Sequence, residues 1–281
     1  MTSTPANHEV CIHQATLMQC DFAESVRCLA RHGVGKTAIW HEKLDGLSIA
    51  NARQTLRDEG VRATSFCVAL LSPHEKNSAD LVLRQIEQAA ELGAETIVVI
   101  SGGLPPGSRD ITSARAAAAE RLAQMLEPAH ASGLQIGLEP LHPMVCGYRS
   151  LWSTLDEAAV VLNKIDAGAR AGLVLDTYAL WWDETLLVQI GRHRDRIISF
   201  HASDWLAETK DLRLDRGIPG DGVIDIAETY AALCAGGSAP DIEVEILSKT
   251  LWQADPDELV ETILSRVEQI TGLQPGEEIA C

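Results

Sequence analysis

Four titratable side chains each stand at the end of a short apolar run, as residues of an active site do at the ends of buried strands. They are Glu139, Asp176, His201 and Glu245. Three carboxylates and one imidazole that converge repel one another and hold mixed protonation states unless a cation lies between them. Oxygen-rich ligation with one nitrogen suits Mn²⁺ or Mg²⁺, with Co²⁺ tolerated, better than a thiolate-bound Zn²⁺. The four residues predict one divalent metal site, with Mn²⁺ preferred, whereas each residue alone could equally be an isolated polar cap.

The elements that position these residues alternate between strand-like and helical patterns along the whole chain. The predicted strands cover residues 10–17, 36–41, 61–70, 96–101, 134–139, 172–176, 196–201 and 241–246. Eight β-then-α units in 281 residues fit a closed (β/α)₈ barrel, for which roughly 250 residues is usual. An open doubly wound sheet is disfavoured because no Gly-x-Gly-x-x-Gly follows the first strand. We expect a single TIM-barrel domain over residues 1–281, with tails at 1–9 and 271–281.

The helices are predicted from apolar spacing and from caps. Val82, Ile86 and Ala89 fall on one helical face, as do apolar residues between positions 118 and 129. Thr154 with Glu157 fits a capping box, and the Asp-Pro pair at 255–256 fits an N-cap followed by proline at the first helical position. In a barrel, catalytic residues lie at the carboxyl ends of strands, where the four titratable side chains are expected.

Composition excludes several classes of partner. Lys and Arg number 23 against 40 Asp and Glu, so the formal net charge is 23 − 40 = −17, which disfavours nucleic acid and anionic membranes. With 46% hydrophobic and 22% charged residues, an ordinary globular core is expected, and no apolar run approaches a membrane span. Seven scattered cysteines without a Cys-x-x-Cys pair and a polar amino terminus predict a cytoplasmic protein with reduced thiols and no signal peptide. A homo-oligomer is a further expectation, although no stretch specifies an interface.

Several segments in the second half together resemble the sugar phosphate isomerase/epimerase family. This is the xylose-isomerase-like TIM barrel superfamily, which also holds ketose 3-epimerases and hydroxypyruvate isomerase. The matching segments are LEPLHP at 138–143, LDTY at 175–178, WWD at 181–183, FHASDW at 200–205, DRGIPGDG at 215–222 and IEVEI at 242–246. The first half agrees only in its barrel pattern.

The resemblance implies a role for each of the four strand-end residues. Glu139, Asp176, His201 and Glu245 match the family's metal ligands, and Glu139 and Glu245 match its proton-transferring pair. Elementary chemistry supports that role, because a metal bound to a carbonyl and the adjacent hydroxyl acidifies the C–H bond between them. Two carboxylates on opposite faces can then form and reprotonate an enediolate. The implied substrate is a small carbohydrate-like molecule.

Five further residues are candidates for substrate binding. Arg216 lies in Arg-Gly-x-x-Gly-x-Gly, and similar enzymes use this arginine to hold substrate oxygens. Asp204 could orient substrate or a ligand, or could equally cap its own loop. The other three candidates could instead have purely structural roles. His142 could be an ordinary loop residue, Trp181 could pack at the rim of the barrel, and His13 could be a histidine of the core.

One residue departs from the family pattern at a position that bears on the reaction. Many relatives carry His three residues after the metal-binding aspartate, where this chain has Ala179. That change removes a donor to a substrate oxygen.

Glu243 shares the strand face of Glu245 but lies farther from the carboxyl end of the strand. We therefore predict that Glu245 is the metal ligand and that Glu243 is a partner residue inside the barrel.

The functional prediction is a metal-dependent isomerase or epimerase acting on a ketose, keto acid or related polyol derivative. The alternative is a dehydratase or lyase that uses the same enolate to expel a hydroxyl. Less favoured are an abasic-site endonuclease, against which the charge of −17 argues, and a barrel that binds sugar without turning it over.

Overall fold

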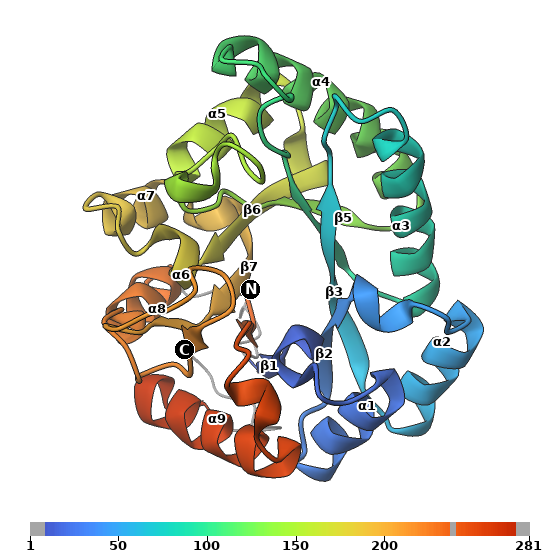
Figure 1. Cartoon of the computed structure of the whole chain (residues 1–281), viewed down its shortest axis with the longest axis vertical. Coiled ribbons are helices and arrows are strands. Elements are labelled where there is room, and N and C mark those ends of the chain that lie inside the picture. The colour runs from blue at the N-terminus through green and yellow to red at the C-terminus, as the bar shows by residue number, and fades with distance from the viewer. Residues whose placement is uncertain (1–8, 237–239, 274–281) are drawn as a thin grey trace, which may run out of the picture.

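Eight parallel strands form the centre of the molecule in a computed structural model that describes residues 9–236 and 240–273. Their order is β1-β10-β7-β6-β5-β4-β3-β2, and the helices surround them (Figure 1). The strands are β1 (Val10–Ile12), β2 (Lys36–Trp40), β3 (Arg62–Leu70), β4 (Thr96–Ile100), β5 (Gln135–Leu138), β6 (Ala171–Asp176), β7 (Ile197–Ala202) and β10 (Ile242–Val244). The predicted TIM barrel is confirmed.

Side-chain hydrogen bonds join β1 to β2 and nearly close the barrel. The other neighbouring strands are joined by backbone ladders. Thr37 Oγ1 on β2 donates to the carbonyl oxygen of Ile12 on β1 at 2.8 Å. The backbone N–H of Trp40 donates to Oε1 of Gln14, two residues after the end of β1, at 3.2 Å. Buried hydroxyl and amide groups therefore replace the ladder at this junction.

The helices form the outer ring and begin at capping residues. They are α1 (Phe22–Arg31), α2 (Ile49–Asp58), α3 (Ser78–Leu92), α4 (Ile111–Ala131), α5 (Leu155–Lys164), α6 (Thr177–Leu180), α7 (Leu186–His193), α8 (Ile226–Cys234) and α9 (Pro256–Thr271). Thr154 accepts a hydrogen bond from the N–H of Glu157, and Asp255 accepts from the N–H groups of Asp257 and Glu258. The predicted cap at Asp255 is confirmed, and each cap satisfies backbone donors that the first turn leaves free. The predicted capping box is confirmed in its Thr154 half only, because the carboxylate of Glu157 accepts from the N–H of Ser153 at 2.8 Å.

The predicted apolar faces pack against the sheet. Val82, Ile86 and Ala89 of α3 are buried, and α3 ends at Gly93, which adopts the left-handed conformation at φ +80°. Glycine adopts that conformation without the steric cost of a side chain. The predicted tail at 271–281 begins at the last residue of α9, and the rest of it beyond residue 273 lies outside the described residues, as does most of the tail at 1–9.

The first predicted strand, residues 10–17, is wrong in its second half. β1 ends at Ile12, and Gln14–Leu17 form a short 3₁₀ helix. His13 causes the change, because its Nδ1 accepts a hydrogen bond from the N–H of Ala15 at 3.0 Å and so caps that helix. Thr16 Oγ1 then donates to the carbonyl of Val244 on β10 at 2.9 Å. Local capping therefore competes successfully with strand pairing after Ile12.

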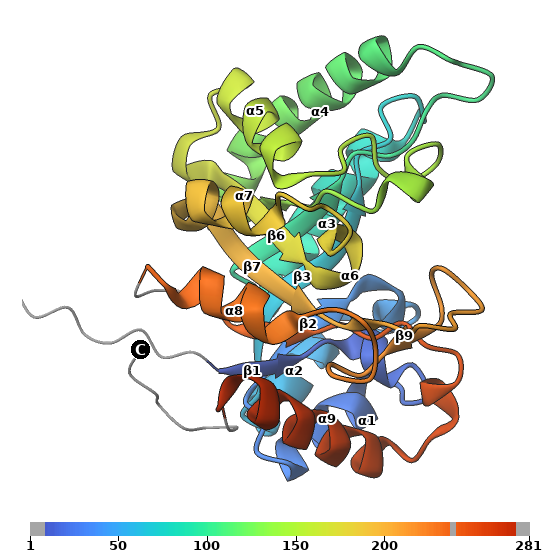
Figure 2. The same ribbon diagram turned by 90° about the vertical axis from the view of Figure 1, so that its left-hand side faces the viewer.

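The loops that follow the carboxyl ends of the strands build one end of the barrel. Figure 2 shows this end on the right, where α6 and the small antiparallel pair β8 (Asp204–Trp205) and β9 (Arg216–Gly217) lie. The pair follows β7 directly and carries Arg216 back toward the strand ends. Within residues 9–236 and 240–273, no helix combines the length and apolar character that crossing a membrane requires.

Candidate active site and metal centre

Glu139, His201 and Glu245 meet at the carboxyl end of the barrel. Glu139 and Glu245 directly follow β5 and β10, His201 lies in β7, and all three are buried. One potential ligand atom from each lies within 4.8 Å of the other two. His201 Nδ1 is 3.5 Å from Oε1 of Glu139 and 4.0 Å from Oε2 of Glu245. Three of the four predicted ligands thus form a cluster that could hold a metal ion.

Asp176, the fourth predicted ligand, lies beside this cluster and faces an arginine. It ends β6 in register with His201 and is fully buried. Its Oδ1 accepts from the N–H of Tyr178 at 2.9 Å, and its Oδ2 accepts from Arg216 at 3.2 Å. Burial, together with Glu245 and Glu139, raises the pKa of Asp176 to about 6 although Arg216 opposes the rise. Burial and the neighbouring carboxylates therefore disfavour the ionised form of Asp176, and a nearby cation such as Arg216 or a metal ion favours it.

His201 is held between two layers of carboxylates. Its Nδ1 faces Glu139 and Glu245, while its Nε2 lies 3.8 Å from Oε2 of Glu243 inside the barrel. Neither ring nitrogen makes a hydrogen bond to the described residues. Burial alone lowers the pKa of His201, but the surrounding carboxylates, Glu139 first, raise it to about 10. A buried imidazole that lacks hydrogen bonds and is surrounded by negative charge fits a divalent cation, whose binding would release its proton.

Glu243 is the interior partner that the strand pattern predicted. Its carboxylate accepts hydrogen bonds from Ser65 at 2.6 Å and from Ser199 at 3.0 Å, and it is buried. Burial raises the pKa of Glu243, while His201 and the two serines oppose that rise. Glu243 thus faces Nε2 from below, and Nδ1 is left for the carboxyl end of the barrel.

Glu245 is flanked by two basic side chains. Its Oε2 accepts a hydrogen bond from Arg216 at 2.9 Å, and its Oε1 lies 3.6 Å from Nε2 of His13. Burial would raise the pKa of Glu245, but Arg216 and the two histidines, His13 and His201, lower it to about 2. Burial lowers the pKa of His13 to about 3 against the opposing charge of Glu245. Glu245 is therefore ionised and ready to accept a proton, and the predicted residue His13 lies at its side.

Arg216 reaches from β9 into the charged centre. It donates to both Asp176 and Glu245, and its guanidinium carbon lies 4.5 Å from the centre of the Tyr178 ring. Its Nε is buried and makes no hydrogen bond to the described residues. An unpaired buried N–H beside the carboxylates is a donor that a substrate oxygen could satisfy.

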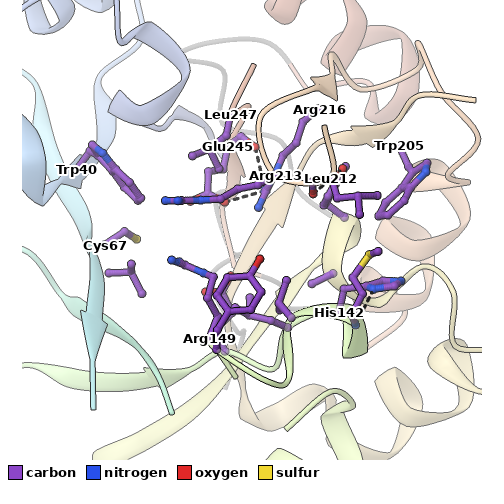
Figure 3. Close-up of a pocket in the computed structure, with 18 residues that line it drawn as sticks. Trp40, Cys67, His142, Arg149, Trp205, Leu212, Arg213, Arg216, Glu245 and Leu247 are labelled. Atoms are coloured by element: carbon purple, nitrogen blue, oxygen red, sulfur yellow. Dashed lines mark hydrogen bonds and ion pairs between the residues drawn. The ribbon is translucent and has the colours of Figure 1, made fainter. Parts of the chain in front are cut away.

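A cavity opens above these residues and is shown in Figure 3. Glu139, Glu245 and Arg216 line its floor, and Ala179 lies in its wall. Tyr178 stacks on Trp205 with ring centroids 4.6 Å apart, which builds one aromatic side. The other lining residues are Trp40, Cys67, Val68, Leu141, His142, Met144, Val145, Tyr148, Arg149, Leu212, Arg213 and Leu247. The cavity combines apolar walls with a few converging polar groups, as small-molecule sites do.

The carboxylate of Asp204 accepts hydrogen bonds from its own loop. Its Oδ2 accepts from the N–H groups of Gly220 and Gly222, both at 2.9 Å, and its Oδ1 accepts from Trp205 and Ile224. A Cβ at Gly222 would lie 2.3 Å from the carbonyl oxygen of Trp205, so this approach requires glycine. Asp204 therefore acts as the loop cap that the sequence offered as its second interpretation.

His142 and Trp181 differ in their distance from the cavity. His142 lines it, and its ring lies 5.3 Å from that of Trp205, centroid to centroid. Trp181 is not one of the lining residues and packs behind them, with its ring 5.6 Å from Trp205. Sequence reasoning did not single out Arg149 and Arg213, which also line the cavity. The only sequence feature that could have indicated them is their position, because both lie in loops that follow strands at the carboxyl end of the barrel.

Comparisons with known proteins identify the family and the fold. Residues 25–267 match the family profile described as Xylose isomerase-like TIM barrel. The solved structure of protein SMc04130 from Sinorhizobium meliloti 1021 is 33% identical, with a TM-score of 0.89 over 94% of this chain and 98% of that chain. Among curated proteins, no sequence matches significantly.

More distant solved structures share the fold. The IolI protein with a bound zinc atom is 16% identical, with a TM-score of 0.81 over 94% of this chain and 98% of that one. A D-allulose 3-epimerase from Methylomonas sp. is 21% identical, with a TM-score of 0.73 over 96% of this chain and 100% of that chain. From the profile match and the similarity to SMc04130, the chain belongs to the xylose isomerase-like TIM barrel family.

Proposed function

We propose that this chain is a divalent-metal-dependent isomerase or epimerase that moves a proton at carbon in a ketose, keto acid or related polyol derivative. The observation that carries the proposal is the placement of two buried carboxylates, Glu139 and Glu245, at 3.5 and 4.0 Å from Nδ1 of His201, which makes no hydrogen bond to the described residues. Two solved neighbours are named D-allulose 3-epimerase and L-ribulose 3-epimerase, and the former was also solved with D-allulose. Their names support this reaction class.

The proposed ligands are Glu139, Asp176, His201 and Glu245, and Mn²⁺ is the proposed ion. When bound, the metal would polarise a carbonyl and its neighbouring hydroxyl and so acidify the C–H bond between them. Carboxylate-rich ligation supports Mn²⁺, whereas the IolI neighbour carries zinc, and elemental analysis of the purified protein distinguishes the two ions. Arg216 now compensates Asp176 and Glu245, and its unpaired Nε–H is placed to hold a substrate oxygen.

The two glutamates divide the proton transfer between them. One carboxylate removes the proton from carbon, the electron pair moves into an enediolate, and a proton then returns to carbon. Return to the same carbon from the opposite carboxylate inverts that centre, and return to the neighbouring carbon exchanges carbonyl and hydroxyl. Glu245 is ionised, a state that Arg216 stabilises, so its carboxylate can accept a proton, and its low pKa makes it a weak base.

A dehydratase or lyase is the second candidate, and Ala179 favours it. This side chain lines the cavity but offers no hydrogen-bond donor. A substrate hydroxyl at that wall would lack the contact that the resemblance implies for a sugar isomerase. The same enediolate could then expel a hydroxyl from the next carbon, with the proton and hydroxide leaving as water.

Deuterium incorporation tests the proposed reaction directly. We expect the Mn²⁺-loaded protein in D₂O to place deuterium on a carbon next to the carbonyl of at least one ketose or keto acid, as measured by NMR. Glu245→Gln should slow the exchange roughly 10²- to 10⁴-fold because it removes one proton-transferring group. Glu261→Gln, which removes the same charge from the exposed face of α9, should exchange like the wild type.

The outcomes separate the candidates. Unchanged exchange in Glu245→Gln would exclude the glutamate pair as the proton carriers. Ultraviolet absorbance from an unsaturated carbonyl product would favour the lyase instead. Absence of exchange across ketoses and keto acids, with metal bound at one ion per chain, would refute the proposed function.

A further inference from the structure

Two arginines line the same side of the cavity, and neither is in direct contact with a carboxylate of the described residues. Arg149 is half-buried and Arg213 is exposed at the mouth. Figure 3 shows both side chains reaching into the cavity on the side of Trp40 and Cys67. Across residues 9–236 and 240–273, neither guanidinium makes an ion pair or a hydrogen bond. Both guanidiniums therefore have N–H donors available in a chain whose net charge is −17.

Other arginines in the protein show what such a side chain normally does. Arg115 pairs with Glu157 at 2.6 Å, and Arg216 pairs with Asp176 and Glu245. Burial and the neighbouring charge of Arg213 lower the pKa of Arg149, and the charges of Glu139 and Glu245 oppose this change only in part. Two neighbouring guanidiniums that repel each other are stabilised by an anion that binds to both.

The backbone of Arg149 is fixed on both sides. A Cβ at Gly103 would lie 2.2 Å from the Cα of Tyr148, so the absence of a side chain there allows the loop to pack closely. Ser150 on the other side is buried and pairs with Gly102 in an isolated bridge. The loop before α5 therefore presents Arg149 at a defined position, which lowers the entropy cost of binding.

The backbone of Arg213 is fixed by a turn and by pairing with the loop after β10. The carboxylate of Asp211 accepts hydrogen bonds from the N–H groups of Arg213 and Leu214, at 3.0 and 3.1 Å. The carbonyl of Leu214 accepts from the N–H of Lys249 at 2.9 Å. Two independent loops thus hold two guanidiniums at one wall of the cavity whose floor carries Glu139 and Glu245.

We propose that Arg149 and Arg213 together bind an anionic group of the substrate, a carboxylate or a phosphate. The inference rests on the proposed function and names its substrate class. Guanidinium groups match both anions through paired N–H donors. The anion would lie by Trp40 and Val68, which line the cavity with the two arginines, and the carbonyl end would reach the glutamates. The favoured substrates are therefore keto acids or ketose phosphates, in preference to neutral ketoses.

Paired substrates test the preference. D-Fructose against 2-keto-D-gluconate, and D-ribulose against D-ribulose 5-phosphate, compare a neutral sugar with its carboxylate or phosphate counterpart. We expect the anionic member of one pair to exchange deuterium with at least about a tenfold higher kcat/KM. The pair that shows this advantage distinguishes a carboxylate from a phosphate. Equal or higher kcat/KM for both neutral members would overturn the proposal while leaving the proposed function intact.

Arginine variants test the residues themselves. Arg149→Met and Arg213→Met should each lower kcat/KM for the anionic member roughly 10- to 100-fold, mainly through KM, and bring its ratio to the neutral member toward one. Arg149→Lys should fall between, since it keeps the charge but loses the paired donors. Arg84→Met on the exposed face of α3 is the matched control and should keep the wild-type ratio. Unchanged preference in folded Arg149→Met and Arg213→Met proteins would refute the assignment.

A binding measurement keeps this inference separate from the reaction. Isothermal titration with inorganic phosphate and with malonate, at low ionic strength, should detect heat with the wild type and Arg84→Met. Arg149→Met should bind the same anion roughly 10-fold more weakly or worse. Equal affinity in all three proteins would refute the anion site, even if no sugar of the panel exchanges deuterium and the proposed function itself fails.

Discussion

Two clusters in the described part of the chain each bring three potential metal ligands within 4.8 Å of one another. The first contains Glu139, His201 and Glu245 at the carboxyl end of the barrel. We call the second, Cys28, His32 and Asp257, the helix cluster because it joins α1 to the start of α9. The two have similar spacing but differ in what already satisfies their charges.

The helix cluster is complete without a metal. Asp257 accepts hydrogen bonds from Arg31 at 2.9 and 3.1 Å and from His32 at 2.8 Å. Burial and Asp257 raise the pKa of the Cys28 thiol to about 12, and a protonated thiol is a poor ligand. The barrel cluster instead leaves both nitrogens of a buried histidine without a hydrogen bond, at 3.5 to 4.0 Å from carboxylates. Proximity of ligand atoms is thus insufficient, and buried ligand atoms without hydrogen bonds distinguish the better metal site.

The largest expected difference between the two clusters appears when the histidine of each cluster is replaced by glutamine, in two separate variants. We expect His201→Gln to abolish stoichiometric metal binding, whereas His32→Gln should keep it, as measured by elemental analysis after gel filtration. A metal present at about 1,000 times its Kd stabilises a fold by about 4 kcal/mol. Removal by EDTA should therefore lower the wild-type Tm by roughly 8–16 °C for a chain of this size.

The two variants should respond oppositely to the chelator. The Tm of His32→Gln should fall with EDTA as the wild-type Tm does, because its barrel cluster is intact. The Tm of His201→Gln should ignore both EDTA and added Mn²⁺. A chelator response that persists in His201→Gln and disappears in His32→Gln would reverse the comparison and place the metal between α1 and α9.

The fold and the strand-end residues of the barrel cluster could be predicted from local pattern. Each ligand follows or ends an apolar run, and neighbouring parallel strands bring such ends together, as Asp176 and His201 show in register. The helix cluster was not predicted, because its residues come from two helices far apart in sequence. Only the packing of α1 against α9 brings Asp257 to Arg31 and His32.

The roles of the loop residues could not be predicted, because they depend on contacts between segments that the sequence pattern does not indicate. The carboxylate of Asp204 is turned away from the cavity by the N–H groups of Gly220 and Gly222, which reach it only after the loop folds back. Arg149 lines the cavity because Gly103, from a different loop, lets Tyr148 approach its backbone. Strand periodicity carries no information about either contact, so these positions required the three-dimensional structure.

A smaller effect is expected from the residue beneath the barrel cluster. Glu243→Gln should weaken Mn²⁺ binding about 10- to 100-fold, because Glu243 faces Nε2 of His201 and favours the tautomer that leaves Nδ1 for the metal. Competition with a fluorescent chelator measures the change. Cys28→Ser in the helix cluster is the control and should bind Mn²⁺ like the wild type. Equal affinities for Glu243→Gln and the control would show that Glu243 has no positioning role.

The smallest effect should come from the helix cluster, as a pH-dependent change in stability. Arg31 and His32 lower the pKa of Asp257 from 3.8 to about 2, so its unfolded state binds protons at higher pH than its folded state. Stabilisation by Asp257 is therefore complete above about pH 4 and is lost as the pH falls toward 2. The Tm of the wild type should exceed that of Asp257→Asn at pH 6, and the difference should shrink between pH 4 and pH 3. EDTA should leave that difference unchanged at pH 6, since an arginine rather than a metal compensates Asp257; a difference that vanishes with EDTA would assign a metal to both clusters.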